Sequence, residues 1–169
     1  MTTIAIYKGW LAADSRSSDE NEVLDDTCQK ISMDRDDGLI ITGAGEGPPL
    51  ERFMYGRWDD IEWPKNGSPI LTKKQLKPLK HCDVWVYRPG DKHFYQSTDM
   101  GFEPIPTNGL PQAIGSGATY FKGAIDALLS VKAAGNLQLS DRSMINLAMQ
   151  SAINIDMYSG GKINIIKLK

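Results

Sequence analysis

The chain has 169 residues, of which 41% are hydrophobic and 24% are charged, and its formal net charge is −2. This length suits a single domain with its own hydrophobic core, and the small net charge predicts no broad attraction to nucleic acid or to an anionic membrane. No apolar run approaches the roughly 20 residues that span a bilayer, and the start lacks the basic-then-apolar pattern of a signal peptide, so a cytoplasmic protein is expected.

The first half of the chain is predicted to consist mostly of strands. A turn at Lys8-Gly9 joins the first two strands into a hairpin, and an acidic turn at residues 34–38 separates the next two. The polar stretch 14–26 is expected to be a loop or a weak hairpin. The short apolar runs predict strands at residues 3–7, 10–13, 29–33 and 39–42.

The middle of the chain is less regular. Residues 50–58 predict a short helix, and residues 59–82, rich in proline, glycine and lysine, predict a surface loop. Two further strands, Val84 to Tyr87 and His93 to Ser97, flank a Pro89-Gly90-Asp91 turn and predict another hairpin.

The last third has a helical pattern. Apolar residues recur at the helical period over residues 117–134, and Ser140 is a plausible N-cap for a second helix. Residues 158–161 end that helix, and residues 163–168 predict a final strand. Strands followed by two helices and a strand favour an α+β layered domain over a βαβ repeat.

The chain offers few residues for metal or redox chemistry. Cys28 and Cys82 are the only cysteines, His81 and His93 are the only histidines, and none of them has metal-ligand spacing. In a cytoplasmic protein this usage predicts free thiols rather than a disulfide. We therefore expect no metal and no cofactor.

The start of the chain carries a candidate nucleophile. Met1 precedes Thr2, and a methionine before a small residue is of the kind that aminopeptidases remove. Thr2 would then hold a hydroxyl and a free α-amine, which is a recognised way of activating a hydroxyl. The reference pKa of an α-amine is roughly 7.7–8.0, so this amine can act as a base near neutral pH. The alternative is that these residues only begin an edge strand.

Six short segments along the chain occur together in a known order. They are Thr2-Thr3-Ile4, Ala13-Asp14-Ser15-Arg16, Lys30-Ile31, Gly43-Ala44-Gly45, Gly115-Ser116-Gly117 and Asp156-Met157-Tyr158-Ser159-Gly160-Gly161. In this order and spacing they resemble a β-type proteasome subunit or the related bacterial HslV-type protease. The resemblance covers nearly the whole chain except about residues 47–112.

The resemblance implies a fold. The family consists of N-terminal-nucleophile (Ntn) hydrolases, whose α+β fold is a four-layer αββα sandwich of antiparallel sheets. A single domain over residues 1–169 is therefore expected. The family has two long helices where this chain has residues 47–83, and at most one short helix fits here, so we expect a reduced helical layer.

The resemblance also implies roles for the matched residues. Thr2 would attack a peptide carbonyl, and Asp14 would pair with Lys30, whose charge lowers the basicity of the nearby amine and stabilises the ionised hydroxyl. The backbone N–H of Gly45 would form the oxyanion hole, and such a donor is typically worth ~2.7–4 kcal/mol of barrier. The residues that would orient the terminal amine and its water are Ser116, Asp156 and Ser159.

Each of these positions also has a structural alternative. Asp14 could merely begin a turn, and Lys30 could be an ordinary exposed strand lysine. Gly45 could be a turn glycine. Ser116 could cap a helix, and Asp156 could only mark a helix end.

Small side chains near the substrate cleft are expected to form a specificity pocket. By resemblance the pocket residues are Ser17, Cys28, Ser32, Gly43 and Gly47. Gly43 would leave the base of this pocket open, so that a bulky apolar side chain of the substrate could enter.

The leading interpretation is a threonine endopeptidase that hydrolyses peptides or proteins through Thr2 after removal of Met1. By resemblance it would form a homo-oligomeric ring or stacked rings, and an ATPase unfoldase could regulate it. Two other interpretations stay open. One is a catalytically inactive, proteasome-like structural or assembly subunit that retains Met1, and the other is an Ntn amidase that acts on a small amide.

Overall fold

The computed structural model describes residues 2–19, 22–34, 38–56, 62–64, 67–107, 109–135 and 137–168. The predictions that fall on Met1, on the centre of the acidic turn (35–37) and on Trp58 lie outside these residues. The chain divides into two compact units, which we describe separately. The terminal unit comprises residues 1–30 and 107–169, and the central unit comprises residues 31–106.

The terminal unit contains a four-stranded antiparallel sheet in the order β10-β1-β2-β11. The predicted first hairpin is present, because Lys8 and Gly9 both have positive φ, 45° and 73°, as a tight two-residue turn requires. The strands are β1 (Thr3–Tyr7), β2 (Trp10–Ala13), β10 (Gln112–Gly115) and β11 (Asn164–Lys167).

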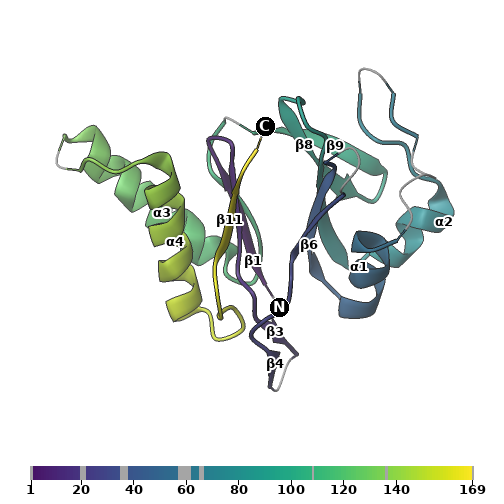
Figure 1. The fold of residues 1–169 in the computed structure, drawn as a ribbon, viewed down its shortest axis with the longest axis horizontal. Helices are drawn as coiled ribbons and strands as arrows, with labels where there is room; N and C mark the ends of the chain where they lie inside the picture. Colours follow the sequence, from purple (N-terminus) through teal and green to yellow (C-terminus); the bar gives the residue numbers. More distant parts are fainter. Residues whose placement is uncertain are drawn as a thin grey trace. The chain divides into compact units, whose positions relative to one another are not determined.

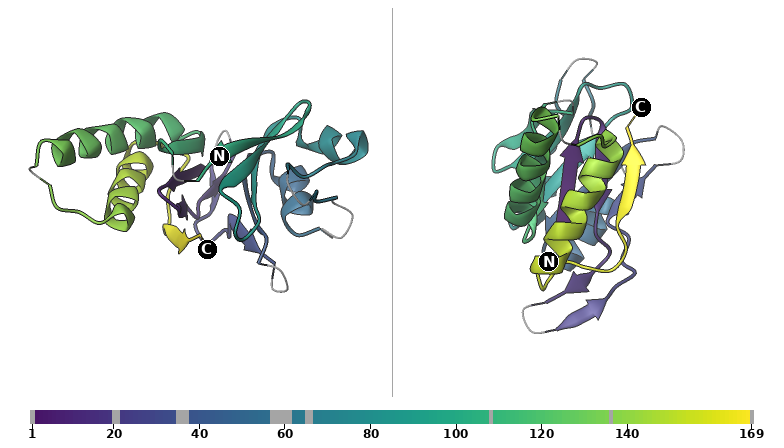
Figure 2. Two further views of the ribbon diagram at one scale, coloured as in Figure 1. Left: turned by 90° about the horizontal axis from the view of Figure 1, so that it is seen from above. Right: turned by 90° about the vertical axis from the view of Figure 1, so that its left-hand side faces the viewer.

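Helices α3 (Ala118–Ala133) and α4 (Asp141–Ile155) pack against each other and against this sheet (Figures 1 and 2). Helix α4 begins as predicted, with the Ser140 side chain accepting a hydrogen bond from Ser143 N at 3.1 Å. The helices and the sheet share one buried apolar cluster. Several alanines in this cluster let the helices approach the strands closely; they are Ala5, Ala12, Ala113, Ala148 and Ala152.

The polar stretch 14–26 contains the weak hairpin that the sequence allowed. Strand β3 (Ser17–Ser18) pairs with β4 (Val23–Asp25), and the register shifts between the two residues of β3. This hairpin belongs to the terminal unit.

The central unit contains a five-stranded antiparallel sheet in the order β5-β6-β7-β8-β9. Strands β6, β7 and β8 match predicted strands, and β9 (Gly101–Pro106) was not predicted. The strands are β5 (Ile31–Met33), β6 (Ile40–Gly45), β7 (Cys82–Tyr87), β8 (His93–Thr98) and β9.

The helices of the central unit are short. Helix α1 (Gly47–Met54) packs on β6 and β7, and it starts earlier than predicted because Pro48 and Pro49 fit the first turn of a helix. Residues 59–82, predicted as loop, also contain helix α2 (Lys73–Leu76) and the 3₁₀ helix η1 (Lys77–Leu79). In the described part of the chain no helix is both long and apolar enough to cross a membrane.

Candidate functional site

Strand register in the terminal unit brings several predicted site residues to one end of its sheet. Thr3 of β1 pairs with Gly115 of β10, and Ile4 pairs with Ala13 of β2. The residues that follow these partners, Asp14 and Ser116, therefore leave the sheet beside the start of β1. This arrangement depends on the pairing of the strands, so the separation of these residues along the sequence does not predict it.

Asp14 is fully buried, and its carboxylate accepts four hydrogen bonds. Oδ1 accepts from Thr3 N and from Lys30 Nζ, both at 2.8 Å. Oδ2 accepts from Gly160 N at 2.9 Å and from Arg16 N at 3.3 Å. Burying a carboxylate is unfavourable without such partners, so the surrounding chain is organised to hold this charge. Asp14 therefore does more than begin a turn.

Lys30 is the cationic partner of Asp14. Its side chain is 7% exposed, so the alternative of an ordinary exposed lysine does not hold. Burial lowers the pKa of the Lys30 ammonium from its ordinary value of 10.5, while the facing Asp14 carboxylate and, more weakly, Cys28 and Asp156 act to raise it. The net effect is an ammonium that loses its proton more readily than an exposed lysine.

Asp156 forms hydrogen bonds with the two serines that were predicted to act with it. It lies at the C-cap of α4, and its Oδ2 accepts from Ser116 Oγ and from Ser159 Oγ, both at 2.6 Å. Ser116 does not cap α3, since the N-cap residue of that helix is Gly117 and no side chain bonds to its N-terminus. Ser116 and Ser159 are thus each hydrogen-bonded directly to Asp156. Asp156 lies at the end of a helix and also belongs to this polar cluster.

Thr2 precedes β1 and is 6% exposed. Ser116 Oγ approaches the Thr2 carbonyl oxygen at 3.5 Å, which links Thr2 to the Asp156 cluster. Thr3, for which we predicted no role, links the same cluster to Asp14, because its Oγ1 lies 2.7 Å from Ser159 Oγ and its N–H donates to Asp14. In the sequence, this link between the two carboxylates is indicated only by the presence of a second threonine directly after Thr2.

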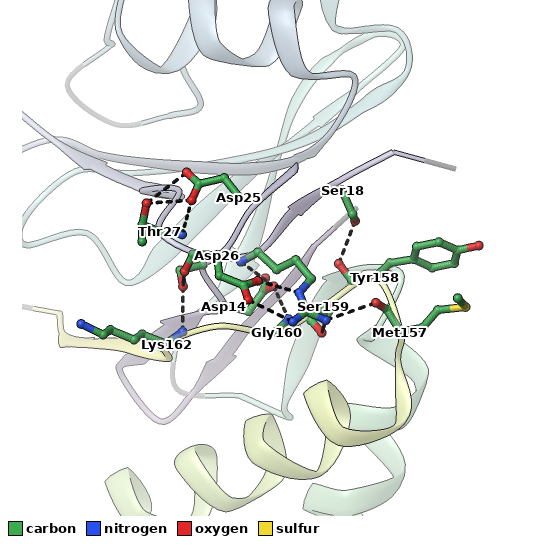
Figure 3. A network of polar contacts seen from close by, with 12 residues as sticks. Asp14, Ser18, Asp25, Asp26, Thr27, Met157, Tyr158, Ser159, Gly160 and Lys162 are labelled. Atoms are coloured by element: carbon green, nitrogen blue, oxygen red, sulfur yellow. Dashed lines mark hydrogen bonds and ion pairs between the residues drawn. The ribbon is translucent and has the colours of Figure 1, made fainter. Parts of the chain in front are cut away.

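Arg16 holds the loop after α4, and the sequence assigned it no role either. Its guanidinium forms a two-pronged ion pair with Asp26, with Nε at 2.7 Å from Oδ1, and it also donates to the carbonyl oxygens of Met157 and Ser159, each at 3.4 Å. Figure 3 shows this network from Asp14 to Gly160, with the Met157 and Tyr158 side chains pointing away from it.

Glycines of the same loop pack too closely for a side chain. A Cβ at Gly160 would lie 2.5 Å from Arg16 Cζ. Gly161 has a φ of +69°, and a Cβ there would meet Ser15 Oγ. These contacts explain why the Gly160-Gly161 pair stands where the loop passes Ser15 and Arg16.

The predicted pocket residues are divided between the two units. Ser17 of β3 and Cys28 belong to the terminal unit, and both are half-buried. Among the described residues, Cys28 and Cys82 form no disulfide bond. The pocket residues that fall in the central unit are Ser32, Gly43 and Gly47, and the predicted oxyanion-hole residue Gly45 belongs to the same unit.

The glycines of the central unit differ in their surroundings. At Gly45, φ is +141° and a Cβ would meet the carbonyl oxygen of His81, so only glycine fits. A Cβ at Gly43 would lie 2.5 Å from Leu50 Cδ1 and 2.9 Å from the Asp83 carbonyl oxygen. The position that a side chain of residue 43 would occupy is therefore filled, and the pocket role of Gly43 stays a prediction. Gly47 begins α1 and has open space around it.

Solved structures with a similar fold exist, although no protein-family model and no curated protein matches this chain. HslV from Trypanosoma brucei matches with a TM-score of 0.65 and 19% identity, over 98% of each chain. BPH from Thiobacillus denitrificans matches with a TM-score of 0.66 and 15% identity, over 100% of this chain and 99% of that chain. BPH in complex with epoxomicin matches with a TM-score of 0.63 and 16% identity over 100% of both chains.

This chain has the Ntn-hydrolase fold. The α+β fold class predicted from the sequence is thereby confirmed, since the likeness extends over nearly the full length of each chain. Within this Ntn-hydrolase fold, the terminal unit supplies a buried ammonium beside a carboxylate, and a second carboxylate that accepts from two hydroxyls. Among the residues described, no group of three or more His, Cys, Asp or Glu side chains is placed to hold a metal ion.

Proposed function

We propose that this protein is a threonine endopeptidase of the proteasome β/HslV type, with Thr2 as its nucleophile once Met1 is removed. The observation that carries the proposal is the buried Asp14–Lys30 ion pair in the unit that also contains Thr2. Buried ion pairs contribute little to stability, because desolvation offsets their attraction. A buried lysine with a lowered pKa is instead typical of a site that performs chemistry.

The hydrogen bonds favour Thr2 over Thr3 as the nucleophile. Thr3 lies within β1, is fully buried, and commits its N–H to Asp14 and its hydroxyl to Ser159. Neither group of Thr3 can therefore serve as base or nucleophile without breaking the network. Thr2 precedes the strand, where loss of Met1 would free its amine.

In the proposed reaction the Thr2 α-amine removes the proton from Thr2 Oγ as that oxygen attacks the scissile carbonyl carbon. The tetrahedral intermediate collapses as the peptide C–N bond breaks, and the leaving amine takes the proton. The resulting ester between Thr2 and the acyl half of the substrate is then attacked by water, which regenerates the hydroxyl and releases a carboxylate. No cofactor enters this scheme.

The neighbouring charges have defined parts in the scheme. The Lys30 ammonium disfavours protonation of the nearby amine and stabilises negative charge developing on Thr2 Oγ, and Asp14 fixes its position. Asp156, with Ser116 and Ser159, would orient the amine and the attacking water. The oxyanion role of Gly45 remains a prediction, as do the pocket roles of the small residues.

Assembly and setting are also part of the proposal. HslV-like proteins suggest self-assembly into rings, and we propose the same for this chain, in a cytoplasmic setting and as one Ntn-hydrolase domain over residues 1–169. An ATPase unfoldase partner is the least supported part of this proposal, because the helices between residues 47 and 83 are short.

The proposal is tested with the purified full-length protein, fluorogenic peptides and Thr2→Ala. Turnover that is lost in Thr2→Ala and retained in Thr119→Val, a change at an exposed threonine of α3, supports the proposal. Turnover that is equal in Thr2→Ala and in the unaltered protein would end it. No peptide turnover, with Met1 retained in the natural source, favours the inactive structural subunit instead. Turnover of small amides but not of peptides favours the amidase.

A further inference from the structure

Thr3 connects the two carboxylate networks of the terminal unit through one residue. Its N–H donates to Asp14 Oδ1 at 2.8 Å, and its Oγ1 lies 2.7 Å from Ser159 Oγ. The residue is fully buried, so water does not compete for either bond. Thr3 follows the proposed nucleophile directly, yet the proposed mechanism gives it no part.

Each hydroxyl group has one proton to donate, which decides which oxygen is the donor in each of these hydrogen bonds. Ser159 Oγ donates its single proton to Asp156 Oδ2 at 2.6 Å. Ser159 Oγ must then accept a hydrogen bond from Thr3 Oγ1. Thr3 is therefore the first donor in the series Thr3, Ser159, Asp156. Ser116 Oγ also donates to Asp156 Oδ2 and approaches the Thr2 carbonyl oxygen.

These contacts flank the peptide group that joins Thr2 to Thr3. Hydrogen bonds run from Thr3 Oγ1 through Ser159 to Asp156, and Ser116, whose single proton goes to Asp156, has its Oγ 3.5 Å from the Thr2 carbonyl oxygen. The peptide group is planar, so the bond from its N–H to Asp14 on one edge restrains the orientation of its C=O on the other. The backbone of Thr2 is thereby restrained as well.

Gly117 provides the room for the Thr3 hydroxyl. A Cβ at Gly117 would overlap Thr3 Oγ1 and would lie 3.2 Å from Asp156 Oδ2. The glycine at the start of α3 therefore leaves the space that the Thr3 hydroxyl occupies.

We propose that Thr3 is a positioning residue, whose buried hydroxyl and amide hold Thr2 in the orientation that attack requires. This inference rests on the proposed function and deepens it. Thr3 touches no reacting atom, so its effect should fall on the rate of the chemical step and leave substrate affinity unchanged. Misplacement of a reacting group by about 1 Å can lower a rate about 100-fold.

The test compares Thr3→Val with Thr3→Ser in the full-length protein, using fluorogenic peptides. Valine has nearly the same shape and retains the N–H but lacks the hydroxyl, so kcat should fall about 10- to 100-fold while KM stays within about threefold. Serine retains the hydroxyl and should keep kcat within about threefold of the unaltered protein. Thr119→Val, at an exposed threonine of α3, is the control and should change neither constant.

Gly117→Ala is the second variant, because it leaves Thr3 chemically intact while the new Cβ displaces the Thr3 hydroxyl and approaches Asp156 Oδ2. It should lower kcat with KM unchanged, as Thr3→Val does, and it carries the test if Thr3→Val does not fold. Unchanged kcat in Thr3→Val or in Gly117→Ala, or an equal loss in Thr3→Ser and Thr3→Val, would overturn the positioning role and leave the proposed function intact. Absence of turnover by the unaltered protein would instead overturn the proposed function.

Discussion

Lys30 and Asp14 form a buried ion pair in the terminal unit. Among the ion pairs of the described residues, only Lys30 and Asp14 are both nearly excluded from solvent, with side chains 7% and 0% exposed. An exposed ion pair contributes roughly 0–1 kcal/mol, so the other pairs explain little of the stability. The Lys30 pair instead places a buried ammonium and carboxylate beside Thr3 at the start of β1.

Replacing Lys30 by methionine removes the cation and leaves the Asp14 carboxylate buried without it. Breaking a buried ion pair in this way should lower the free energy of unfolding by about 3–5 kcal/mol. Peptide turnover should fall by about 100-fold or more, as when a preorganised electrostatic group is removed. Denaturant unfolding and peptide assays measure the two effects. The control is Lys122→Met, at an exposed lysine of α3, and equal effects of the two changes would contradict this account.

The pH dependence of activity should report two groups. The Thr2 amine must be neutral to act as base, so activity should rise through the range of an α-amine, roughly pH 7.7–8.0 or below it. Lys30 must stay charged, and burial lowers its pKa. As the pH rises, its charge and hence the activity should therefore be lost before pH 10.5 is reached. The profile of kcat/KM against pH measures both limbs.

Lys30→Arg provides the control for the alkaline limb, because a guanidinium stays protonated in this range. Even with lower turnover, the variant should keep its relative activity at the pH where the unaltered protein loses it. An alkaline limb at the same pH in both proteins would show that Lys30 does not cause it.

The sequence suggested most of the polar site but not how its parts connect. Asp14, Lys30 and the serines around Asp156 were identified from their order along the chain. Thr3 was missed, because a threonine inside an apolar strand looks like an ordinary β-branched residue. Its role depends on the hairpin register and on the loop after α4, which only the folded chain brings together.

At the scale of elements, the short and proline-containing segments were hardest to predict. Strand β9 contains Pro104 and Pro106, and prolines normally argue against a strand. β9 tolerates them because it is the edge strand of its sheet, bonded only to β8. Helix α2 is four residues long, but its Thr72 and Gln75 form a capping box, a signal present in the sequence.

The end of β6 gives a test of local structure in the central unit. Gly45→Ala should lower the free energy of unfolding by roughly 1–3 kcal/mol, because φ is +141° there and the new Cβ would lie 2.6 Å from Cys82 Cα. Gly47→Ala, two residues later, meets open space and should change stability by less than about 0.5 kcal/mol. Denaturant unfolding compares the two, and equal values would contradict the described backbone.

At the scale of the whole molecule, the order of elements was sufficient to predict the fold class. The likeness to HslV and BPH covers nearly the full chain although identity is only 15–19%. Such a likeness defines a fold, whereas activity depends on the particular residues at the site. Between residues 47 and 83 the described helices are short, in line with the reduced helical layer expected there.

The state of Thr2 is the central claim, and intact-mass spectrometry after incubation with epoxomicin, the compound bound in one BPH structure, tests it most directly. We expect the natural protein to lack Met1 and to gain the mass of one epoxomicin per chain, and Thr2→Ala to gain none. A protein that retains Met1 and gains no mass, or an equal gain by Thr2→Ala, would contradict the assignment of Thr2 as the nucleophile.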